Sequence, residues 1–332
     1  MRIPVTDSSP VAIRILSAGL LTTVQDLGRP GFQRYGMPVG GAMDPWSLRC
    51  ANRLVGNRDD AAALEVTAKG PELRFESGIT FAVTGASFRL TLDGADVPMW
   101  TRIRTGAGSI LKFGARLRGA RAYLACAGGI DVPLVMGSRA THIPSQIGGV
   151  EGRALRAGDR LRCGTARSID RDRRDWIDAL PPAMRPELIP CPTLRVILGP
   201  HGDRFAPEAL GVLTSSIYTL SPQSDRMGYR LEGPSLDHLN PDAGTMLTEP
   251  TPVGAIQVPP NRRPILLMAD CQTTGGYPAI AVLIAADRRM AAQLLPGDHI
   301  RFTAIDRQEA VRCLAEQSHT LDAILPPIPS VP

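Results

Sequence analysis

Polar side chains suited to proton transfer and to amide recognition cluster between residues 248 and 277. Within this stretch, residues 270–277 read DCQTTGGY and separate two short apolar runs, 265–268 and 280–285. A turn needs one or two glycines and at most an acid, so an acid, an amide, two hydroxyls and a phenol together indicate a polar recognition loop. The alternative is a connecting loop whose side chains satisfy its own backbone. The candidate substrate-binding residues of this loop are Gln272, Thr273, Thr274, Gly275, Gly276 and Tyr277.

Two acids in this stretch are candidates for catalysis. Glu249 precedes the proline-stiffened segment GAIQVP, which carries the further binding candidate Gln257, and Asp270 opens the polar loop. A carboxylate can accept a proton from water or from an amide nitrogen, while amide, hydroxyl and glycine N–H groups can donate to a carbonyl oxygen. Acids combined with glutamines and threonines suit a small polar amide or carboxylate better than a metal or a nucleotide.

A pair of arginines supplies candidate groups for an anionic substrate. Arg226 and Arg230 are four residues apart in the segment SDRMGYRL. If this segment is extended, both side chains lie on one face, because side chains alternate along a strand. Two guanidiniums on one face could hold a carboxylate or a carbonate-like oxyanion. The alternative is that they pair with the neighbouring acids Asp225, Glu232 and Asp237.

The first half of the chain adds four candidate binding residues. Asp26 and Arg29 flank a tight glycine-containing turn, where they face either each other or a ligand. Asp44 precedes a proline and a helical pattern, so it is a good N-cap, and the glycines ahead of it leave N–H groups where an anion could sit. Arg139 lies in the segment GSRAT, which resembles the GSR-x-T signature of the biotin-dependent carboxyltransferase family, and this resemblance makes it a candidate anion contact.

The elements that position these residues are mainly strands. Alternating or continuous apolar runs at 12–16, 79–83, 88–92, 121–125, 160–162 and 194–198 predict strands of a barrel or sandwich. We expect a first β domain at 1–165, a charged and proline-rich linker at 166–192 with a short helix around Trp176, and a second β domain at 193–305. A capping pattern at Asp306 and Glu309 predicts a helix within 306–332, ahead of a proline-rich tail.

Composition excludes several classes of function. The 332 residues are 43% hydrophobic and 21% charged, as in an ordinary soluble globular protein. Of the 37 basic residues 35 are arginine, and they are scattered among acids without a basic run, which argues against nucleic-acid binding. The six cysteines are widely spaced, without a metal-binding pattern, and no apolar run is long enough to cross a membrane. We therefore expect a cytoplasmic protein with no membrane association and no bound metal.

Several strings resemble the biotin-dependent carboxyltransferase family. These are DLGRPGF and MPVGGAMD near the start, and GAIQVP, PILLMADCQTTGGYP and AQLLPGD in the second half. The family includes the C subunit of bacterial 5-oxoprolinase, the regulatory protein KipA, and a module of urea carboxylase long labelled allophanate hydrolase subunit 2. The resemblance implies two cyclophilin-like β-barrel domains. It is more specific for the family than for one activity, since one fold carries different reactions.

The resemblance implies three alternative functions. The first is the C subunit of an ATP-dependent 5-oxoprolinase, converting 5-oxoproline to glutamate and active only with a KipI-like B subunit and a LamB/YcsF-like A subunit. The second is the carboxyltransferase subunit of a biotin-dependent urea or amide carboxylase. The third is a KipA-like antagonist of a kinase inhibitor. Neither lysine, Lys69 or Lys112, has a biotin-attachment setting, and no phosphate-binding loop is present. ATP, and carboxybiotin if it is used, would thus come through partner subunits.

One residue departs from the family pattern. Cys271 stands where the similar string has arginine, as D-R-Q-T-T-G-G-Y. The loop therefore loses a guanidinium unless Arg262 or Arg263 reaches into it, and this change could alter the charge preference for the substrate.

Overall fold

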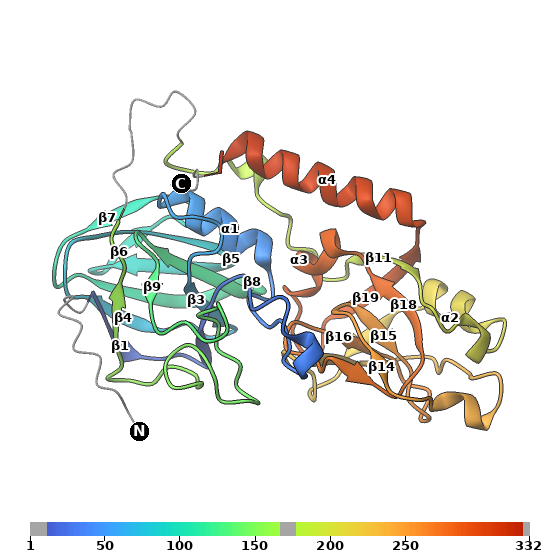
Figure 1. The fold of residues 1–332 in the computed structure, drawn as a ribbon. Helices are drawn as coiled ribbons and strands as arrows, with labels where there is room; N and C mark the ends of the chain where they lie inside the picture. Colours follow the sequence, from blue (N-terminus) through green and yellow to red (C-terminus); the bar gives the residue numbers. More distant parts are fainter. Residues whose placement is uncertain (1–11, 167–176, 328–332) are drawn as a thin grey trace, which may run out of the picture.

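The computed structural model describes residues 12–166 and 177–327, which form two β-rich domains side by side (Figure 1). The predicted mainly β class with two barrel-like sheets is confirmed. Each domain has its own hydrophobic core, and the segment between residues 186 and 192 leads from one to the other. The two predicted features at the margins of the description, the helix around Trp176 and the tail beyond residue 327, lie outside the described residues.

The first domain is a ten-stranded antiparallel sheet. Seven strands follow one another across it in the order β2-β3-β8-β4-β1-β10-β9, while β5 pairs with β6, β7 and β8. The strands are β1 (Ile13–Ser17), β2 (Leu21–Gln25), β3 (Ala63–Thr67), β4 (Glu72–Phe75), β5 (Ile79–Leu92), β6 (Ala95–Val97), β7 (Ile103–Thr105), β8 (Ile110–Cys126), β9 (Ile130–Asp131) and β10 (Arg160–Cys163).

The two longest strands differ from the prediction. We expected separate strands at 79–83 and 88–92, but β5 is continuous over 14 residues and pairs along its length with β8. The register shifts several times between Gly85 and Leu90, which marks a bulged region. Gly85 has a φ of 86°, and a side chain there would meet the Arg121 carbonyl of β8. The bulge breaks the alternation that the strand prediction relies on.

Helix α1 (Pro45–Leu54) packs against β5 and β8, and it begins where the sequence predicted. The Asp44 side chain accepts hydrogen bonds from the backbone N–H of Ser47 at 3.0 Å and from its hydroxyl at 2.7 Å. Pro45 occupies the first turn, where a missing N–H costs nothing. The helix places its cap, Asp44, against the second domain.

The second domain is a closed barrel of seven strands. Their order is β11-β18-β15-β16-β13-β12-β19, closed by the parallel pair β11 and β19. The strands are β11 (Thr193–Leu198), β12 (Tyr218–Leu220), β13 (Gly228–Glu232), β15 (Ala255–Gln257), β16 (Ile265–Leu267), β18 (Ala279–Leu283) and β19 (His299–Ala304). A separate two-stranded sheet joins β14 (Glu249–Pro250) to β17 (Thr274–Gly275). The short helices of this domain are α2 (Ala209–Ser215) and α3 (Arg288–Ala291), and its 3-10 turns are η3 (Gly202–Arg204), η4 (Pro241–Gly244) and η5 (Ala285–Asp287). Two further 3-10 turns, η1 (Gln33–Tyr35) and η2 (Pro182–Met184), precede the barrel in the chain.

Helix α4 (Arg307–Ile324) connects the two domains, as the red helix in Figure 1 shows. Asp306 caps it by accepting from the Glu309 N–H at 2.8 Å, as predicted. Along its length the helix contacts η5 and β11 of the second domain, but Leu321 and Leu325 are buried in the first core. Arg53 of α1 holds this end through Asp322 at 2.7 Å and the Leu325 carbonyl at 2.5 Å.

The start of the segment between the domains belongs to the first domain. Leu180, inside the predicted linker, is fully buried in the first core and its N–H donates to the Trp100 carbonyl at 2.8 Å. The Arg102 N–H donates to the Asp178 carbonyl at 2.7 Å. The charge and proline content of residues 166–192 predicted a linker, but the part around Leu180 packs on the first sheet.

Candidate functional site

Arg226 is the centre of a buried ion network between the two domains. Its guanidinium donates to both carboxylate oxygens of Asp270, at 2.8 Å and 3.1 Å, and to the Gly41 carbonyl at 2.6 Å. A third group, the Glu65 carboxylate on β3 of the first domain, also pairs with it. All three side chains are nearly inaccessible to solvent. The predicted site residues Arg226 and Asp270 are thus brought together, but their side chains bind each other and not a ligand.

Charge compensation explains why these groups are buried. Burial alone would lower the pKa of Arg226, but the carboxylates of Glu65 and Asp270 outweigh it and raise that pKa. Glu65 also accepts from the Tyr123 hydroxyl at 2.7 Å and from the Met43 N–H at 2.8 Å. Such a satisfied network positions the domains relative to each other, and it leaves Asp270 without a free oxygen for a substrate.

The network continues through Asp44 to a second contact between the domains. The Asp44 N–H donates to the Tyr123 hydroxyl at 2.8 Å, and the Gln293 amide, after α3, donates to the Asp44 carboxylate at 2.9 Å. Gln293 also accepts from the N–H groups of Ala120 and Arg121 at 3.0 and 3.1 Å. Burial raises the pKa of Asp44, and hydrogen bonds from Ser47 and Gln293 oppose this. The predicted anion site at this helix end is therefore occupied by the helix's own cap.

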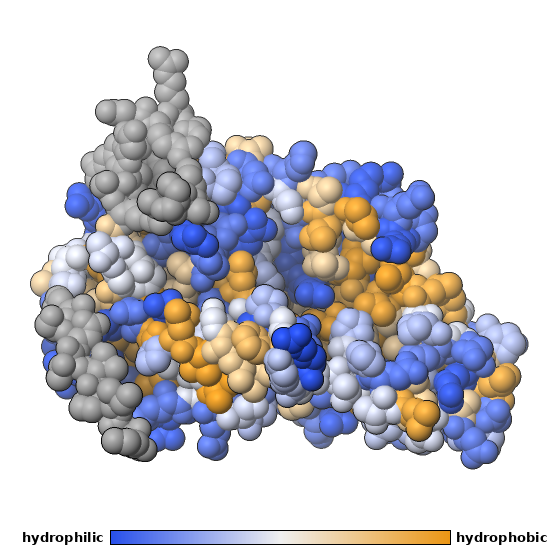
Figure 2. Space-filling view, in the orientation of Figure 1, coloured by the Kyte–Doolittle hydropathy of each residue, from blue (hydrophilic) through white to orange (hydrophobic). Residues whose placement is uncertain are grey.

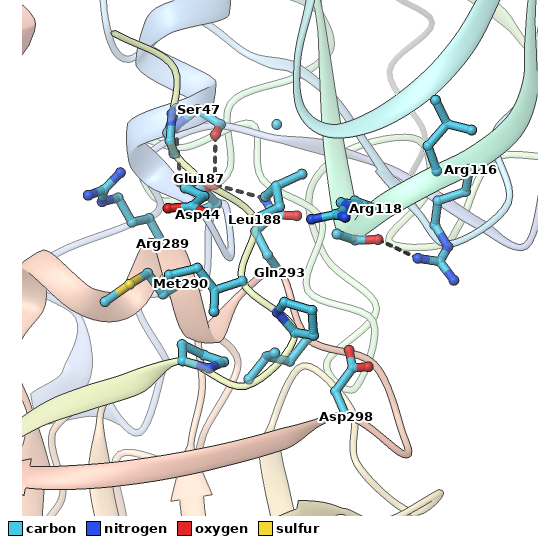
Figure 3. A pocket seen from close by; sticks show the side chains of 18 of the residues that line it. Asp44, Ser47, Arg116, Arg118, Glu187, Leu188, Arg289, Met290, Gln293 and Asp298 are labelled. Carbon is cyan, nitrogen blue, oxygen red and sulfur yellow. Dashed lines mark hydrogen bonds between the residues drawn. The ribbon is translucent and has the colours of Figure 1, made fainter. Parts of the chain in front are cut away.

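A small cavity of about 180 Å³ lies beside Asp44 and Gln293 (Figure 3). Its charged side chains are balanced in sign: Arg116, Arg118, Arg289, Asp44, Glu187 and Asp298. Asp44 and Gln293 bond each other across it, and Arg116 donates to the Gly119 carbonyl at 2.9 Å. We therefore regard it as a gap in the domain contact.

Asp26 and Arg29 are both buried, and no hydrogen bond or ion pair joins their side chains. Burial lowers the pKa of Arg29, and the charge of Asp26 opposes this effect. Asp26 accepts from the Gly28 N–H, the Ser138 hydroxyl and the Arg139 N–H at 2.6–2.7 Å, so it holds the turn and the loop around Arg139 together. The Arg139 side chain pairs with Asp131 at 3.0 Å, beside an open pocket of the first domain. Arg29 donates to the Ala140 carbonyl, and its Nη1 has no hydrogen-bond partner among the described residues.

The polar loop folds onto the segment that precedes β15. Strand β17 of the loop pairs with β14, so that Glu249 lies opposite Gly275. The buried Gln257 amide donates to the Tyr277 carbonyl at 3.2 Å and accepts from Gln272 at 3.4 Å. A side chain on Gly275 would lie 2.6 Å from the Gln257 amide, which explains the glycine there. Thr273 is partly exposed, Thr274 and Tyr277 are exposed, and Gly276 contacts Met246 through a 2.9 Å backbone bond.

Glu249 is paired with a histidine that the sequence did not connect to it. The Ala279 N–H donates to Nδ1 of His201 at 3.0 Å, so Nε2 carries the hydrogen and donates to the Glu249 carboxylate at 3.2 Å. Glu249 retains 54% side-chain exposure and a free oxygen. Of the two predicted catalytic acids, Glu249 is the accessible one.

The expectation that Arg226 and Arg230 share one face is wrong. Arg226 is buried, whereas Arg230 is exposed on β13. Asp225 accepts from the N–H groups of Met227 and Gly228 at 2.8 and 3.2 Å, and this turn separates Arg226 from the strand. Alternation therefore does not extend from Arg230 back to Arg226.

A cavity of about 260 Å³ is lined by residues of both domains, and we call it the interdomain cavity. Signature strings of both halves supply its walls, together with one charged side chain, Arg288 of α3. The first domain contributes Leu27, Gln33, Val39, Gly40, Ala42, Met43 and Pro45, and the second Pro252, Val253, Gly254, Leu267, Met268, Ala269, Leu283 and Arg288. The polar loop adjoins it, since the Thr251 N–H donates to the Thr273 carbonyl and its hydroxyl to the Gln272 carbonyl.

The cationic groups at this cavity were not all foreseen. Cys271 is buried in a small apolar cluster, and burial raises its pKa to about 11, so it is a neutral thiol. Arg262 and Arg263 do not replace the missing guanidinium, because both are exposed and Arg262 pairs with Asp237 at 3.0 Å. Arg288 lies near Cys271 instead. No sequence signal indicated that Arg288 lies at this cavity, since the segment ADRRMA around it contains no recognisable motif.

The described residues hold no cluster of metal-ligating side chains. Within residues 12–166 and 177–327, no three His, Cys, Asp or Glu side chains are grouped as a metal ion would require. In the same ranges, every helix is too short or too polar to cross a bilayer.

Known proteins resemble this chain over nearly its whole length. The domain family described as carboxyltransferase domain, subdomain A and B, matches residues 35–304. The C subunit of 5-oxoprolinase from Escherichia coli (strain K12) is 40% identical over 314 residues, covering 94% of this chain and 97% of that protein. Urea amidolyase of Saccharomyces cerevisiae is 34% identical over 323 residues, covering 92% of this chain but 17% of that protein.

A solved structure shows the same arrangement of domains. The urea amidolyase of K. lactis superposes with a TM-score of 0.89 at 32% sequence identity, covering 96% of this chain. The chain corresponds to 20% of that longer polypeptide. It therefore spans a fifth or less of the urea amidolyases, but almost all of the 5-oxoprolinase C subunit.

Proposed function

Because this chain belongs to the family of carboxyltransferase domains with subdomains A and B, we propose that it is the C subunit of an ATP-dependent 5-oxoprolinase. In this role it opens the lactam of 5-oxoproline to glutamate together with partner subunits. Similarity to the 5-oxoprolinase C subunit along almost the full length of both chains supports this function over the alternatives. The observation that carries it is the interdomain cavity, whose walls come from signature strings of both halves.

Glu249 is the residue that we assign as general base. Hydrolysis of the lactam breaks the C–N bond, adds a hydroxyl to the carbonyl carbon and returns a proton to the nitrogen, so a base must activate water. Glu249 is an accessible acid of the polar stretch, and His201 orients it by donating from Nε2. Two residues separate it from Pro252 of the cavity wall, so the two Cα atoms are at most about 10 Å apart along an extended chain.

The polar loop supplies donors for the carbonyl oxygen, where charge builds up as water attacks. Thr273, Thr274 and Tyr277 are the accessible hydroxyl groups, and Gln272 is held by Gln257. Preorganised donors of this kind stabilise the developing oxyanion, because they are fixed before the reaction begins. Asp270 has a positioning role here, since both of its oxygens hold Arg226.

We propose that ATP is bound by the partners, a KipI-like B subunit and a LamB/YcsF-like A subunit. The lack of a phosphate-binding loop in the sequence supports this assignment. Figure 2 shows apolar surface gathered over the second domain beside α4, and Val311 and Leu314 of that helix are exposed. Surfaces of this kind are commonly covered on assembly.

A second candidate function is the carboxyltransferase subunit of a biotin-dependent amide carboxylase. The superposition on urea amidolyase favours it, because the whole chain matches one part of that enzyme. The same Glu249 would then accept the proton of the amide nitrogen that becomes carboxylated. Without a biotin-attachment lysine here, carboxybiotin would be delivered by a partner.

The deciding experiment is reconstitution of the complex with the A and B subunits. We expect ATP-dependent release of glutamate from 5-oxoproline, and no activity from this chain alone. The change Glu249→Gln should lower turnover by about 100-fold or more, as removal of groups used in the transition state does. Its matched control is Glu232→Gln on β13, which is exposed and outside the site.

The outcomes separate the functions. Glutamate release that survives Glu249→Gln with a normal rate would contradict the assigned base. Carboxylation of urea or an amide with a biotin carboxylase and carrier, and no release of glutamate, would support the second candidate. Tight partner binding with neither activity would support a KipA-like regulatory role.

A further inference from the structure

Arg288 is a partly buried cation at the interdomain cavity, and it has no carboxylate partner among the described residues. Its Nη2 donates to the Val253 carbonyl at 3.2 Å, and its Nε has no hydrogen-bond partner among the described residues. Arg288, Val253 and Gly254 all line the cavity. No Asp or Glu of the described ranges lies within ion-pairing distance of it. Burial accordingly lowers the pKa of Arg288, and the nearby Cys271 is the group that opposes this.

A second unpaired donor lies behind the cavity wall of the first domain. Arg29 is 1% exposed, and its Nη1 has no partner in the described part of the chain. Gly40 lines the cavity, and Arg29 Nη1 lies next to it. A Cβ atom built on Gly40 would be 3.4 Å from this nitrogen. The same Cβ would lie 3.5 Å from Asp270 Oδ1, but that carboxylate is already bound by Arg226. Glycine here leaves room for a ligand atom.

These observations point to a binding site for a small anion. A buried guanidinium costs free energy unless an acceptor pairs with it, and arginine at a protein site pairs best with a planar carboxylate. Two other arginines of the second domain are paired with acids: Arg226 holds Glu65 and Asp270, and Arg195 holds Asp287 at 2.6 Å. Arg288 differs from both, since it faces a cavity rather than a carboxylate.

We infer that Arg288 binds the carboxylate of the substrate in the interdomain cavity and thereby selects carboxylate-bearing lactams over neutral ones. The inference rests on the proposed function for the identity of the lactam. Arg29 assists from behind the cavity wall of the first domain. The site binds a cyclic amide that carries a carboxylate on the ring carbon next to the nitrogen. The carboxylate lies near Arg288, and the amide group lies toward the polar loop and Glu249.

The test uses the reconstituted complex with two substrates, 5-oxoproline and 2-pyrrolidinone, which is the same lactam without a carboxylate. The change Arg288→Gln should raise KM for 5-oxoproline by about 10- to 100-fold, as loss of a charge-assisted hydrogen bond does, and change kcat little. Kinetic constants for 2-pyrrolidinone should stay within about threefold. Arg288→Lys should lie between, since it keeps the charge and loses the planar fork.

Controls separate binding from folding. Arg263→Gln removes an exposed arginine of the same domain and should leave both substrates unaffected. The melting temperature of Arg288→Gln should stay close to that of the wild type, because Arg288 is only partly buried and the variant breaks no ion pair. A large fall in melting temperature with unchanged KM would show a structural role and overturn the inference.

Equilibrium binding of 5-oxoproline without ATP, measured by calorimetry on the same complex, distinguishes the two proposals. Binding that is lost in Arg288→Gln, in a complex that releases no glutamate, would support the carboxylate site and contradict the proposed reaction. Normal turnover of 5-oxoproline with the same KM in wild type and Arg288→Gln would contradict the site and leave the proposed reaction in place.

Discussion

At the scale of single residues, polar groups of similar appearance in the sequence have opposite roles in the structure. Glu249 and Asp270 both border the polar loop, but one is exposed beside His201 and the other is buried against Arg226. The difference lies in partners that are distant in sequence. Glu65, which completes the pair with Arg226, is 161 residues away. No local sequence pattern encodes such a contact. The polar character of the loop could therefore be predicted, but not which of its two acids is exposed and which is buried in an ion pair.

Removal of Arg226 should test its structural role. We expect Arg226→Met to lower the free energy of unfolding by about 3–5 kcal/mol, because Glu65 and Asp270 would remain buried without their cation. Chemical denaturation monitored by circular dichroism measures this loss. Arg230→Met is the matched control, since Arg230 is exposed and its loss should cost less than about 0.5 kcal/mol. Equal stability of the two variants would contradict the assignment of Arg226 to the domain contact.

At the scale of elements, local signals predicted the starts of helices well. Asp44 and Asp306 both cap helices as expected, because a cap depends on residues within one turn. Strand extents were predicted less well, as the bulge near Gly85 shows. The course of α4 across both domains could not be predicted either. Its amphipathic pattern indicates that some surface is covered, but not that its two ends are covered by different domains.

The far end of α4 should contribute strongly to stability. Leu321 is fully buried in the first core, so Leu321→Ala should cost about 2–5 kcal/mol through lost burial and the cavity left behind. Leu314→Ala, on the same helix, should change stability by less than about 0.5 kcal/mol, because Leu314 is 42% exposed. Thermal unfolding of the two variants provides the comparison. Similar melting temperatures would show that this end of the helix does not hold to the first domain in solution.

At the scale of the whole molecule, the two domains are joined by buried polar contacts as well as by α4. A turn with the same hydrogen bond precedes β10 and β19: Asp159 accepts from the Arg156 N–H, and Asp298 from the Leu295 N–H, each at 2.8 Å. The contact between the domains was not predicted, since Gln293, Tyr123 and Arg121 carry no motif that distinguishes them from ordinary core residues.

Gln293 should couple the unfolding of the two domains. Its amide bonds Asp44, the Arg121 carbonyl and two backbone N–H groups of β8, so Gln293→Ala leaves several buried groups unpaired. We expect a loss of about 2–3 kcal/mol, and a calorimetric transition that broadens or splits where the wild type shows one. Gln317→Ala is the control, because Gln317 makes one bond, to Ala286 of the second domain. A single sharp transition in both variants would contradict this coupling.

The position of Leu321 and Leu325 also bears on how the chain folds during its synthesis. Strand β10 of the first domain ends at Cys163, and Leu325 follows 325 − 163 = 162 residues later. At roughly 5–20 residues per second, a ribosome needs on the order of 10–30 s to make that interval. During this interval the strands of the first sheet have been made, but Leu321 and Leu325 of its core have not. The nascent first domain therefore exposes apolar surface until translation is nearly complete, and chaperones that bind such surface have that interval in which to act.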